Sequence, residues 1–106
     1  MRLGLIDLGS NTVKLALYQI QGTQFTPLDF QARFVKILNY IEGDRLSPEG
    51  VQRLVEVLVE YQEICREKAI EQLECFSTGS LRQITNQAQV IAQVRQQTGI
   101  TIHPIS

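Results

Sequence analysis

The sequence predicts an α/β protein built on one mixed β-sheet. Short apolar stretches that alternate with polar residues fill the first third of the chain. Two longer segments then carry apolar residues at three- and four-residue steps, and each is followed by another short apolar stretch. The expected order is strand, strand, strand, helix, strand, helix, strand. The three N-terminal strands should be antiparallel, and the helical crossovers should make the later strands parallel.

Three strands are expected before the first helix. The first covers about residues 3–6, and the second covers Val13–Tyr18 with strict alternation of apolar side chains. The run Asp7-Leu8-Gly9-Ser10-Asn11-Thr12 is expected to form a tight turn between them. After a second glycine-containing turn, a third strand is expected from about Gln24 to Ile37. Pro27 must lie at its start or edge because proline has no N–H to donate to a sheet.

The first helix has a clear start. Ser47 is a favourable N-cap, Pro48 suits the first helical position, and Glu49 places an acid in the first turn. The expected buried face consists of Val51, Leu54, Val55, Leu58, Tyr61, Ile64 and Cys65. Glutamates and glutamines fill the opposite side, so we expect that side to be solvated.

The last third of the chain repeats the strand and helix alternation. A short strand is expected over Gln72–Phe76, and a second helix from about Ser80 to Thr98 with Gly99 as its stop. A last strand begins near Ile100 and reaches Ser106 without a further helix. One face of the sheet is therefore expected to lack the cover that α/β sheets normally have.

Length, composition and the distribution of charge indicate one domain and argue against some classes of function. The chain has 106 residues, of which 43% are hydrophobic and 20% charged, which suits one compact domain. The net charge of -1 hides an uneven layout. Residues 42–74 carry nine acids and four bases, while residues 1–41 and 75–106 each sum to +2. Because no dense basic face is indicated, nonspecific nucleic-acid binding is not expected.

Location follows from the apolar runs and the cysteines. Arg2, Asp7 and Lys14 interrupt the N-terminal apolar stretch, so neither a membrane span nor a signal peptide is expected. Cys65 and Cys75 lack the spacing of metal or disulfide motifs. We expect two reduced packing thiols in a cytoplasmic protein.

The first turn is a candidate phosphate loop. Gly9, Ser10 and Asn11 can aim successive backbone N–H groups at a phosphate oxygen, and Ser10 and Thr12 add hydroxyl donors. Asp7 ends the first strand beside it, where a carboxylate can hold a divalent cation or orient a water molecule. An ordinary hairpin turn is the alternative.

A second candidate loop lies between the fourth strand and the second helix. Ser77-Thr78-Gly79-Ser80 would place the exposed N–H groups of a helix start beside an anion. Arg82 can reach the same region with a bidentate guanidinium. The alternative is a simple helix N-cap with a solvated arginine.

Three motifs, in this order, resemble the exopolyphosphatase and guanosine pentaphosphate phosphatase (Ppx/GppA) family. They are Leu5–Leu15, Arg45–Gly50, and Ser77–Arg82 with Asn86. Other actin-like, sugar-kinase and chaperone ATPases share the first motif more loosely, whereas the combination of all three is more specific. The resemblance implies an actin-like (ribonuclease H-like) half-domain.

The resemblance also implies a place in a larger enzyme. Residues 1–106 would form a single domain, the N-terminal lobe of a two-lobed hydrolase that faces a missing C-terminal lobe across a cleft. There, water would release the terminal phosphate of inorganic polyphosphate or guanosine pentaphosphate (pppGpp) with a divalent metal, expected to be Mg²⁺. The family's catalytic glutamate lies beyond the position of Ser106. No catalytic residue is therefore expected among residues 1–106. The resemblance also implies that the chain is truncated before the final helix of the lobe. Alone, this fragment should be inactive.

By the same resemblance, Asp7 would lie near the metal. The phosphate-binding residues would be Gly9, Ser10, Asn11, Thr12, Thr78, Gly79, Ser80 and Arg82. Two other functions remain open: a non-catalytic phosphate- or nucleotide-binding module with a regulatory role, and a lobe of a sugar or acetate kinase, which shares the first loop. Pairing at the edge of the final strand would also allow a homodimer.

Overall fold

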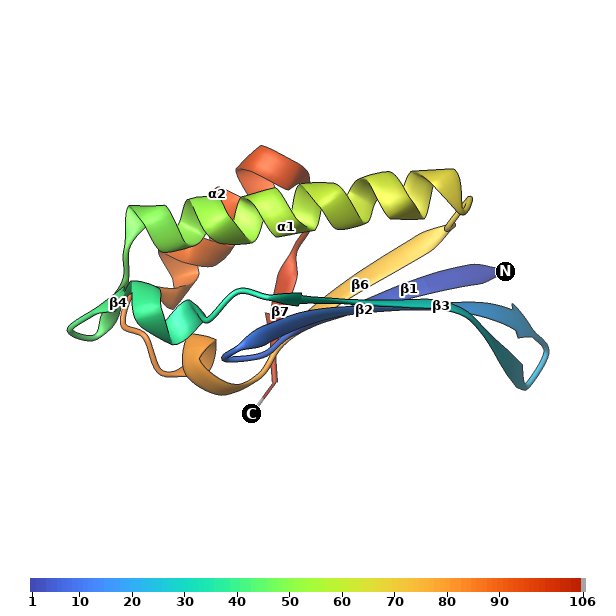
Figure 1. Cartoon of the computed structure of the whole chain (residues 1–106), viewed down its shortest axis with the longest axis horizontal. Coiled ribbons are helices and arrows are strands. Elements are labelled where there is room, and N and C mark those ends of the chain that lie inside the picture. The colour runs from blue at the N-terminus through green and yellow to red at the C-terminus, as the bar shows by residue number, and fades with distance from the viewer. Residues whose placement is uncertain (106) are drawn as a thin grey trace.

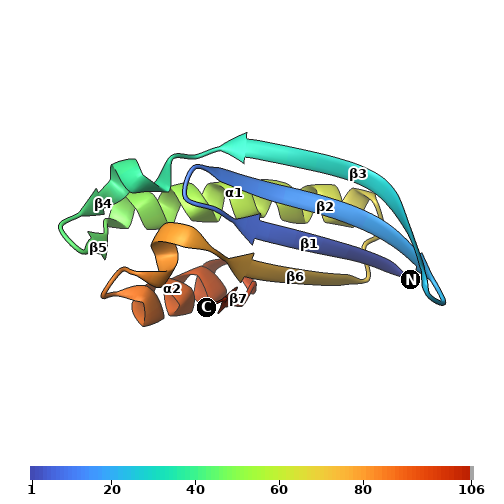
Figure 2. The same ribbon diagram turned by 90° about the horizontal axis from the view of Figure 1, so that it is seen from below.

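The computed structural model describes residues 1–105, apart from the side chain of Ser80. A five-stranded sheet has the order β3-β2-β1-β6-β7 (Figures 1 and 2). Its strands are β1 (Arg2–Leu8), β2 (Thr12–Gln21), β3 (Gln24–Phe34), β6 (Gln72–Ser77) and β7 (Ile102–Pro104). The first three are antiparallel neighbours, whereas β1, β6 and β7 run parallel. The predicted mixed sheet is confirmed.

Two α-helices, α1 (Pro48–Glu67) and α2 (Gln87–Thr98), lie on the same face of this sheet (Figure 1). Within residues 1–105 the two α-helices leave the opposite face of strands β1, β2 and β3 without an α-helix (Figures 1 and 2). The remaining elements are the 3-10 helices η1 (Ile37–Tyr40) and η2 (Gly79–Arg82) and the short hairpin of β4 (Ile41–Glu42) and β5 (Arg45–Leu46). Neither α1 nor α2 combines the length and apolarity that crossing a membrane requires.

Helix α1 forms as its sequence predicts. The Ser47 hydroxyl accepts a hydrogen bond from the N–H of Gly50 at 3.1 Å, and Pro48 occupies the first turn. The apolar face of α1 packs against the inward side chains of β1 and β2, among them Ile6, Leu15 and Leu17, and buries them completely or nearly so. This packing removes apolar surface from water and supplies the main stabilisation of the layer.

Tyr61 is the polar anchor between α1 and the sheet. Its ring is fully buried, and its hydroxyl donates a hydrogen bond to the backbone oxygen of Val13 at 2.5 Å. Burial raises the pKa of Tyr61, opposed by the nearby Arg33 guanidinium, so the phenol keeps its proton and remains a donor. Arg33 lies 5.7 Å from the ring centroid and also pairs with Glu60. The bond to Val13 fixes the start of β2, immediately after the first candidate loop.

Replacing Tyr61 with phenylalanine tests this anchor. The change leaves the Val13 oxygen without its tyrosine partner in a buried setting, so the free energy of unfolding should fall by about 1–3 kcal/mol. Urea unfolding followed by circular dichroism measures the difference. Tyr18→Phe, on the bare face of the sheet, is the matched control and should change stability by less than about 0.5 kcal/mol. If Tyr61→Phe and Tyr18→Phe lower the free energy of unfolding equally, the hydrogen bond from Tyr61 to Val13 does not stabilise the fold as described.

The third strand is shorter than predicted. It ends at Phe34 rather than Ile37, because the N–H groups of Val35 and Lys36 turn away to donate to the backbone oxygen of Asn11 at 2.8 and 2.9 Å. Lys36 has a φ of 54°, a left-handed conformation that a strand cannot contain. The chain bends there toward η1, beside the first loop.

The second helix begins later than predicted. Residues expected to start it at Ser80 form η2 and a turn, and α2 starts at Gln87. The Gln87 side chain donates to the backbone oxygen of Leu81 at 2.6 Å, which favours the tight turn over a continuous helix. The predicted stop is confirmed, since Gly99 closes α2 with a φ of 80°.

Strand β3 forms an edge of the sheet, and its own charged side chains occupy part of that edge. The Asp29 carboxylate accepts the N–H of Phe30 at 2.8 Å, and the Arg33 guanidinium donates to the backbone oxygen of Ala32 at 3.2 Å. A second strand adding to this edge would need such donors and acceptors. The two charges therefore disfavour edge-to-edge pairing, beside exposed Phe30 and Phe34.

Removing both charges should allow β3 to pair with the same strand of a second molecule. In Asp29→Ala/Arg33→Ala, the edge N–H and C=O groups are uncovered, and we expect concentration-dependent self-association in sedimentation velocity. Arg53→Ala/Glu56→Ala, which deletes an ion pair from the exposed side of α1, leaves the net charge equally unchanged and serves as control. A monomeric edge variant at millimolar concentration would show that other features protect β3.

Candidate functional site

The candidate site lies where three parallel strands end. Leu8 of β1 is in register with Ser77 of β6, and Ser77 is in register with Pro104 of β7. The loops that follow these strands therefore leave the sheet side by side. In open α/β sheets, ligands bind at the carboxyl ends of the strands. Both loops that the sequence singled out lie at this edge.

Main-chain hydrogen bonds shape the first loop. The N–H of Gly9 donates to the backbone oxygen of Thr12 at 3.1 Å, and Ser10 accepts from the N–H of Ile37 at 3.0 Å. Asn11 accepts from both residues that follow β3. A Cβ at Gly9 would lie 3.0 Å from the Thr12 oxygen, so this close approach favours glycine. The loop is therefore fastened to η1 as well as to its own strands.

The two loops contact each other. The N–H of Thr78 donates to the backbone oxygen of Leu8 at 3.0 Å, and its hydroxyl donates to Asp7 Oδ1 at 3.2 Å. Gly79, with a φ of 72°, approaches Ser10 so closely that a Cβ would collide with the Ser10 hydroxyl oxygen. Two predicted site residues of the first loop region, Asp7 and Ser10, are thus neighbours of two from the second loop, Thr78 and Gly79.

Arg82 and Ser80 belong to η2, at the far side of the second loop. The Arg82 guanidinium donates to the backbone oxygen of Ile105 at 2.9 Å, which directs it to the end of β7. The side chain of Ser80 lies outside the described part of the structure. Because α2 starts at Gln87, the second loop does not sit at the start of an α-helix, and the predicted helix-dipole contribution there is wrong.

The charges at this edge are few. Asp7 is exposed and faces exposed Lys14 across the β1–β2 ladder, while the Lys36 ammonium lies 5.1 Å from the centroid of the Phe34 ring. Among residues 1–105 no three histidine, cysteine or acidic side chains gather as a metal site. A single carboxylate with a neighbouring hydroxyl fits Mg²⁺, which keeps several waters and binds through one or two carboxylates plus phosphate oxygens.

The thiol beneath the site is inert. Cys75 is buried on β6, and burial together with the Asp7 carboxylate raises its pKa to about 12. Cys65 is also buried, and burial raises its pKa too. Both thiols therefore remain protonated at neutral pH, which makes them poor nucleophiles. Their predicted packing role is confirmed.

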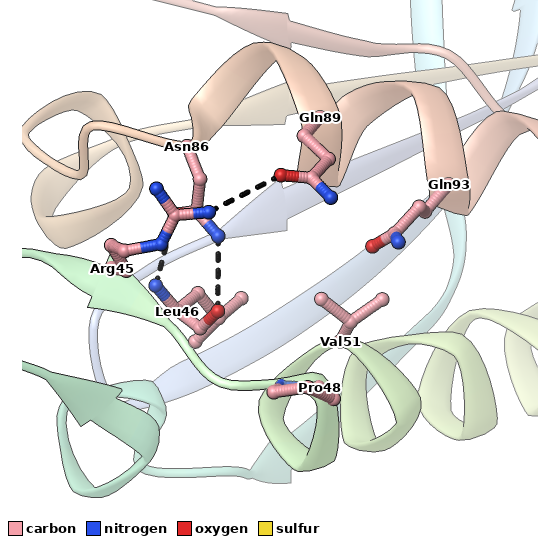
Figure 3. Close-up of a pocket in the computed structure, with 7 residues that line it drawn as sticks. All are labelled: Arg45, Leu46, Pro48, Val51, Asn86, Gln89 and Gln93. Carbon is pink, nitrogen blue, oxygen red and sulfur yellow. Dashed lines mark hydrogen bonds between the residues drawn. The ribbon is translucent and has the colours of Figure 1, made fainter.

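Sequence reasoning missed how the second motif joins the site. Arg45 and Leu46 form β5, and Asn86 docks on it, with Oδ1 accepting from the N–H of Leu46 and Nδ2 donating to its oxygen, each at 3.0 Å (Figure 3). In the sequence, Asn86 belongs to the third motif and falls inside the helix expected from Ser80 to Thr98, and nothing there indicates a contact with the second motif. No local pattern indicates a partner forty residues away.

Gly79→Ala tests the contact between the loops. Its φ costs any side chain about 1 kcal/mol, and the collision with Ser10 adds to that, so the free energy of unfolding should fall by about 2–4 kcal/mol. Gly22→Ala is the control, since Gly22 has a φ of 61° but open space around it. Urea unfolding should show a larger loss at Gly79, which Ser10→Gly should partly restore. Equal losses at the two glycines would contradict the contact.

Comparison with known proteins identifies the family of the chain. The model of the "Ppx/GppA phosphatase family" matches residues 16–106. Exopolyphosphatase 1 of Mycobacterium tuberculosis is 26% identical over 107 residues, which cover 99% of this chain and 31% of that protein. The chain therefore spans about a third of this curated relative's length.

Solved structures show the same fold. A Ppx/GppA family member of Aquifex aeolicus superposes with a TM-score of 0.90 at 24% identity, covering 99% of this chain and 35% of that one. An exopolyphosphatase of Cytophaga hutchinsonii gives a TM-score of 0.90 at 23% identity, covering 99% and 34%. The fold is the actin-like α/β fold of these proteins, and the family match over most of the sequence shows that the chain belongs to the Ppx/GppA phosphatase family.

Proposed function

We propose that residues 1–106 form the N-terminal phosphate-binding lobe of a phosphoanhydride hydrolase, which releases the terminal phosphate of inorganic polyphosphate or pppGpp. The observation that carries the proposal is the meeting of the two loops at the carboxyl ends of β1 and β6. Hydroxyls, one carboxylate and the main chain of two loops gather there, and such groups suit a phosphate and its counter-cation. The relative named exopolyphosphatase supports polyphosphate as a substrate.

In the proposed reaction, water attacks the terminal phosphorus and the bond to the bridging oxygen breaks. The products are inorganic phosphate and a chain one phosphate shorter. The protein's part in such a transfer is mainly positioning and charge stabilisation. Gly9, Ser10, Asn11 and Thr12 would hold the phosphate from one side. Thr78, Gly79, Ser80 and Arg82 would hold it from the other.

Asp7 would bind a divalent metal, expected to be Mg²⁺, through its carboxylate. The bound ion would neutralise phosphate charge and polarise a phosphoryl oxygen. Without a cation the same carboxylate repels a phosphate, so Asp7 makes anion binding dependent on the metal. Lys14, across the ladder from Asp7, would add positive charge to the rim.

A second lobe, absent from this chain, would complete the site from the opposite side of a cleft and supply the glutamate that orients the attacking water. We therefore expect the 106-residue chain to bind tripolyphosphate and pppGpp and to release phosphate very slowly, because half of a phosphate clamp lacks the paired stabilisation of transfer. The buried thiols favour a reducing compartment, in keeping with a cytoplasmic location.

Two substitutions separate the roles of metal and arginine. Asp7→Asn should bind tripolyphosphate more tightly than the unchanged chain without Mg²⁺, because a repelling charge is gone, and should lose the gain in affinity that Mg²⁺ brings. Arg82→Ala should weaken binding by about tenfold to a hundredfold in both conditions, since a charged hydrogen bond is worth about 1.5–3 kcal/mol. Isothermal titration calorimetry measures both.

Arg95→Ala is the matched control for Arg82, because Arg95 lies in the last turn of α2. It should bind tripolyphosphate like the unchanged chain. If Asp7→Asn keeps the full effect of Mg²⁺, the metal assignment is wrong. If Arg82→Ala and Arg95→Ala weaken binding equally, the effect is only one of net charge. Rapid phosphate release by the unchanged chain would contradict the need for a second lobe.

A further inference from the structure

Asn86 stands at the N-cap of α2, yet its side chain makes no capping hydrogen bond there. An asparagine at this position usually accepts from the first-turn N–H groups and stabilises the helix by about 0.5–2 kcal/mol. Here the side-chain oxygen accepts a hydrogen bond from the N–H of Leu46 in β5, and the side-chain nitrogen donates one to the oxygen of the same residue, each at 3.0 Å (Figure 3). The side chain thus satisfies one N–H and one C=O of the hairpin, as a neighbouring strand would.

Neighbouring residues join the same two segments. The N–H of Thr85 donates to the backbone oxygen of Asp44 at 2.8 Å, and its hydroxyl approaches the same oxygen at 3.3 Å. On the other side of Asn86, Arg45 donates to the Gln89 side chain at 3.4 Å (Figure 3). The chain that enters α2 is therefore held on the hairpin over several residues, with the bidentate Asn86 contact at the centre.

The segment held in this way leads directly from the second phosphate loop. Arg82 ends η2 shortly before Asn86, and the Gln87 side chain ties Leu81 of η2 to the start of α2. At the other end of η2, Gly79 packs against Ser10 of the first loop. Movement of Asn86 away from β5 would therefore displace η2 relative to the first loop.

We propose that Asn86 is a positioning residue, which holds the second phosphate loop in register with the first by docking on the backbone of Leu46. The proposal rests on the proposed function, because it assigns a purpose to the spacing of two phosphate loops. Asn86 itself touches no phosphate. Because its amide is bonded to a hairpin forty residues earlier in the chain, the place of that hairpin determines where Thr78, Gly79 and Arg82 lie.

Asn86→Ser and Asn86→Ala separate this role from helix capping. Serine is a good N-cap but is too short to span both Leu46 atoms, whereas alanine can do neither. Docking predicts that both variants weaken binding of inorganic tripolyphosphate with Mg²⁺ about tenfold, within the range of mutations that act through a connecting network. Both should also speed hydrogen exchange at the Leu46 amide about tenfold or more. Gln93→Ala, in the same helix and lining the same hollow (Figure 3), should change neither quantity.

Calorimetry and amide exchange are measured on the 106-residue chain at a temperature where unfolding curves show every variant folded. A serine variant that binds tripolyphosphate like the unchanged chain overturns the proposal and leaves Asn86 with a capping role only. If the unchanged chain binds no tripolyphosphate, the proposed function is contradicted. Exchange at the amides of residues 79–81 then decides the positioning role: faster exchange in both variants supports it, and unchanged exchange in Asn86→Ser overturns it.

Discussion

The parallel register between β1 and β6 places every other part of the candidate site. Because Leu8 lies beside Ser77, its oxygen accepts the N–H of Thr78, and the two strands leave the sheet at the same height. A slip of one residue would turn Asp7 into the apolar layer under α1, where an unpaired carboxylate is very costly. The exposed carboxylate of the site therefore also protects the register that creates the site.

A small number of polar contacts hold the other elements in place around these two strands. Tyr61 ties α1 to β2 immediately after the first loop, and Ser47 starts α1 immediately after β5. Gly50, in the first turn of α1, allows close packing on Tyr40 and Leu46, because any side chain there would overlap theirs. The three sequence motifs are thus connected parts of one framework. Only the first and third contribute atoms to the proposed phosphate site.

Elements with local signals could be predicted, and elements that depend on distant partners could not. Alternation is enough to identify the strands, Ser47-Pro48 to start α1, and Gly99 to end α2. The later start of α2 could not be seen, because Leu81 and Ile84 fit a helical period yet lie in η2 and a turn. One hydrogen bond that favours the turn is local, from Gln87 to Leu81, but the two bonds of Asn86 reach across forty residues to β5. The two-residue strands of the β4–β5 hairpin are too short to show alternation.

The candidate site divides in the same way. Residue type alone predicts that glycine, serine, asparagine and threonine after a strand can hold a phosphate. Their meeting with Thr78 and Gly79 requires a register that only the folded sheet defines. The same holds for Arg82, whose guanidinium is directed to the end of β7 by the backbone oxygen of Ile105, immediately after the last strand.

Main-chain hydrogen bonds fix the curvature of the first loop, since Gly9, Ser10 and Asn11 use backbone N–H or C=O groups to bond Thr12, Ile37 and the two residues after β3. At position 10 the close approach of Gly79 limits the size of the side chain, whereas the side chain of Asn11 is exposed. Position 11 can therefore vary during divergence, or in a laboratory library, while the loop keeps its curvature. Selectivity among anions can then be altered separately from the scaffold that presents it.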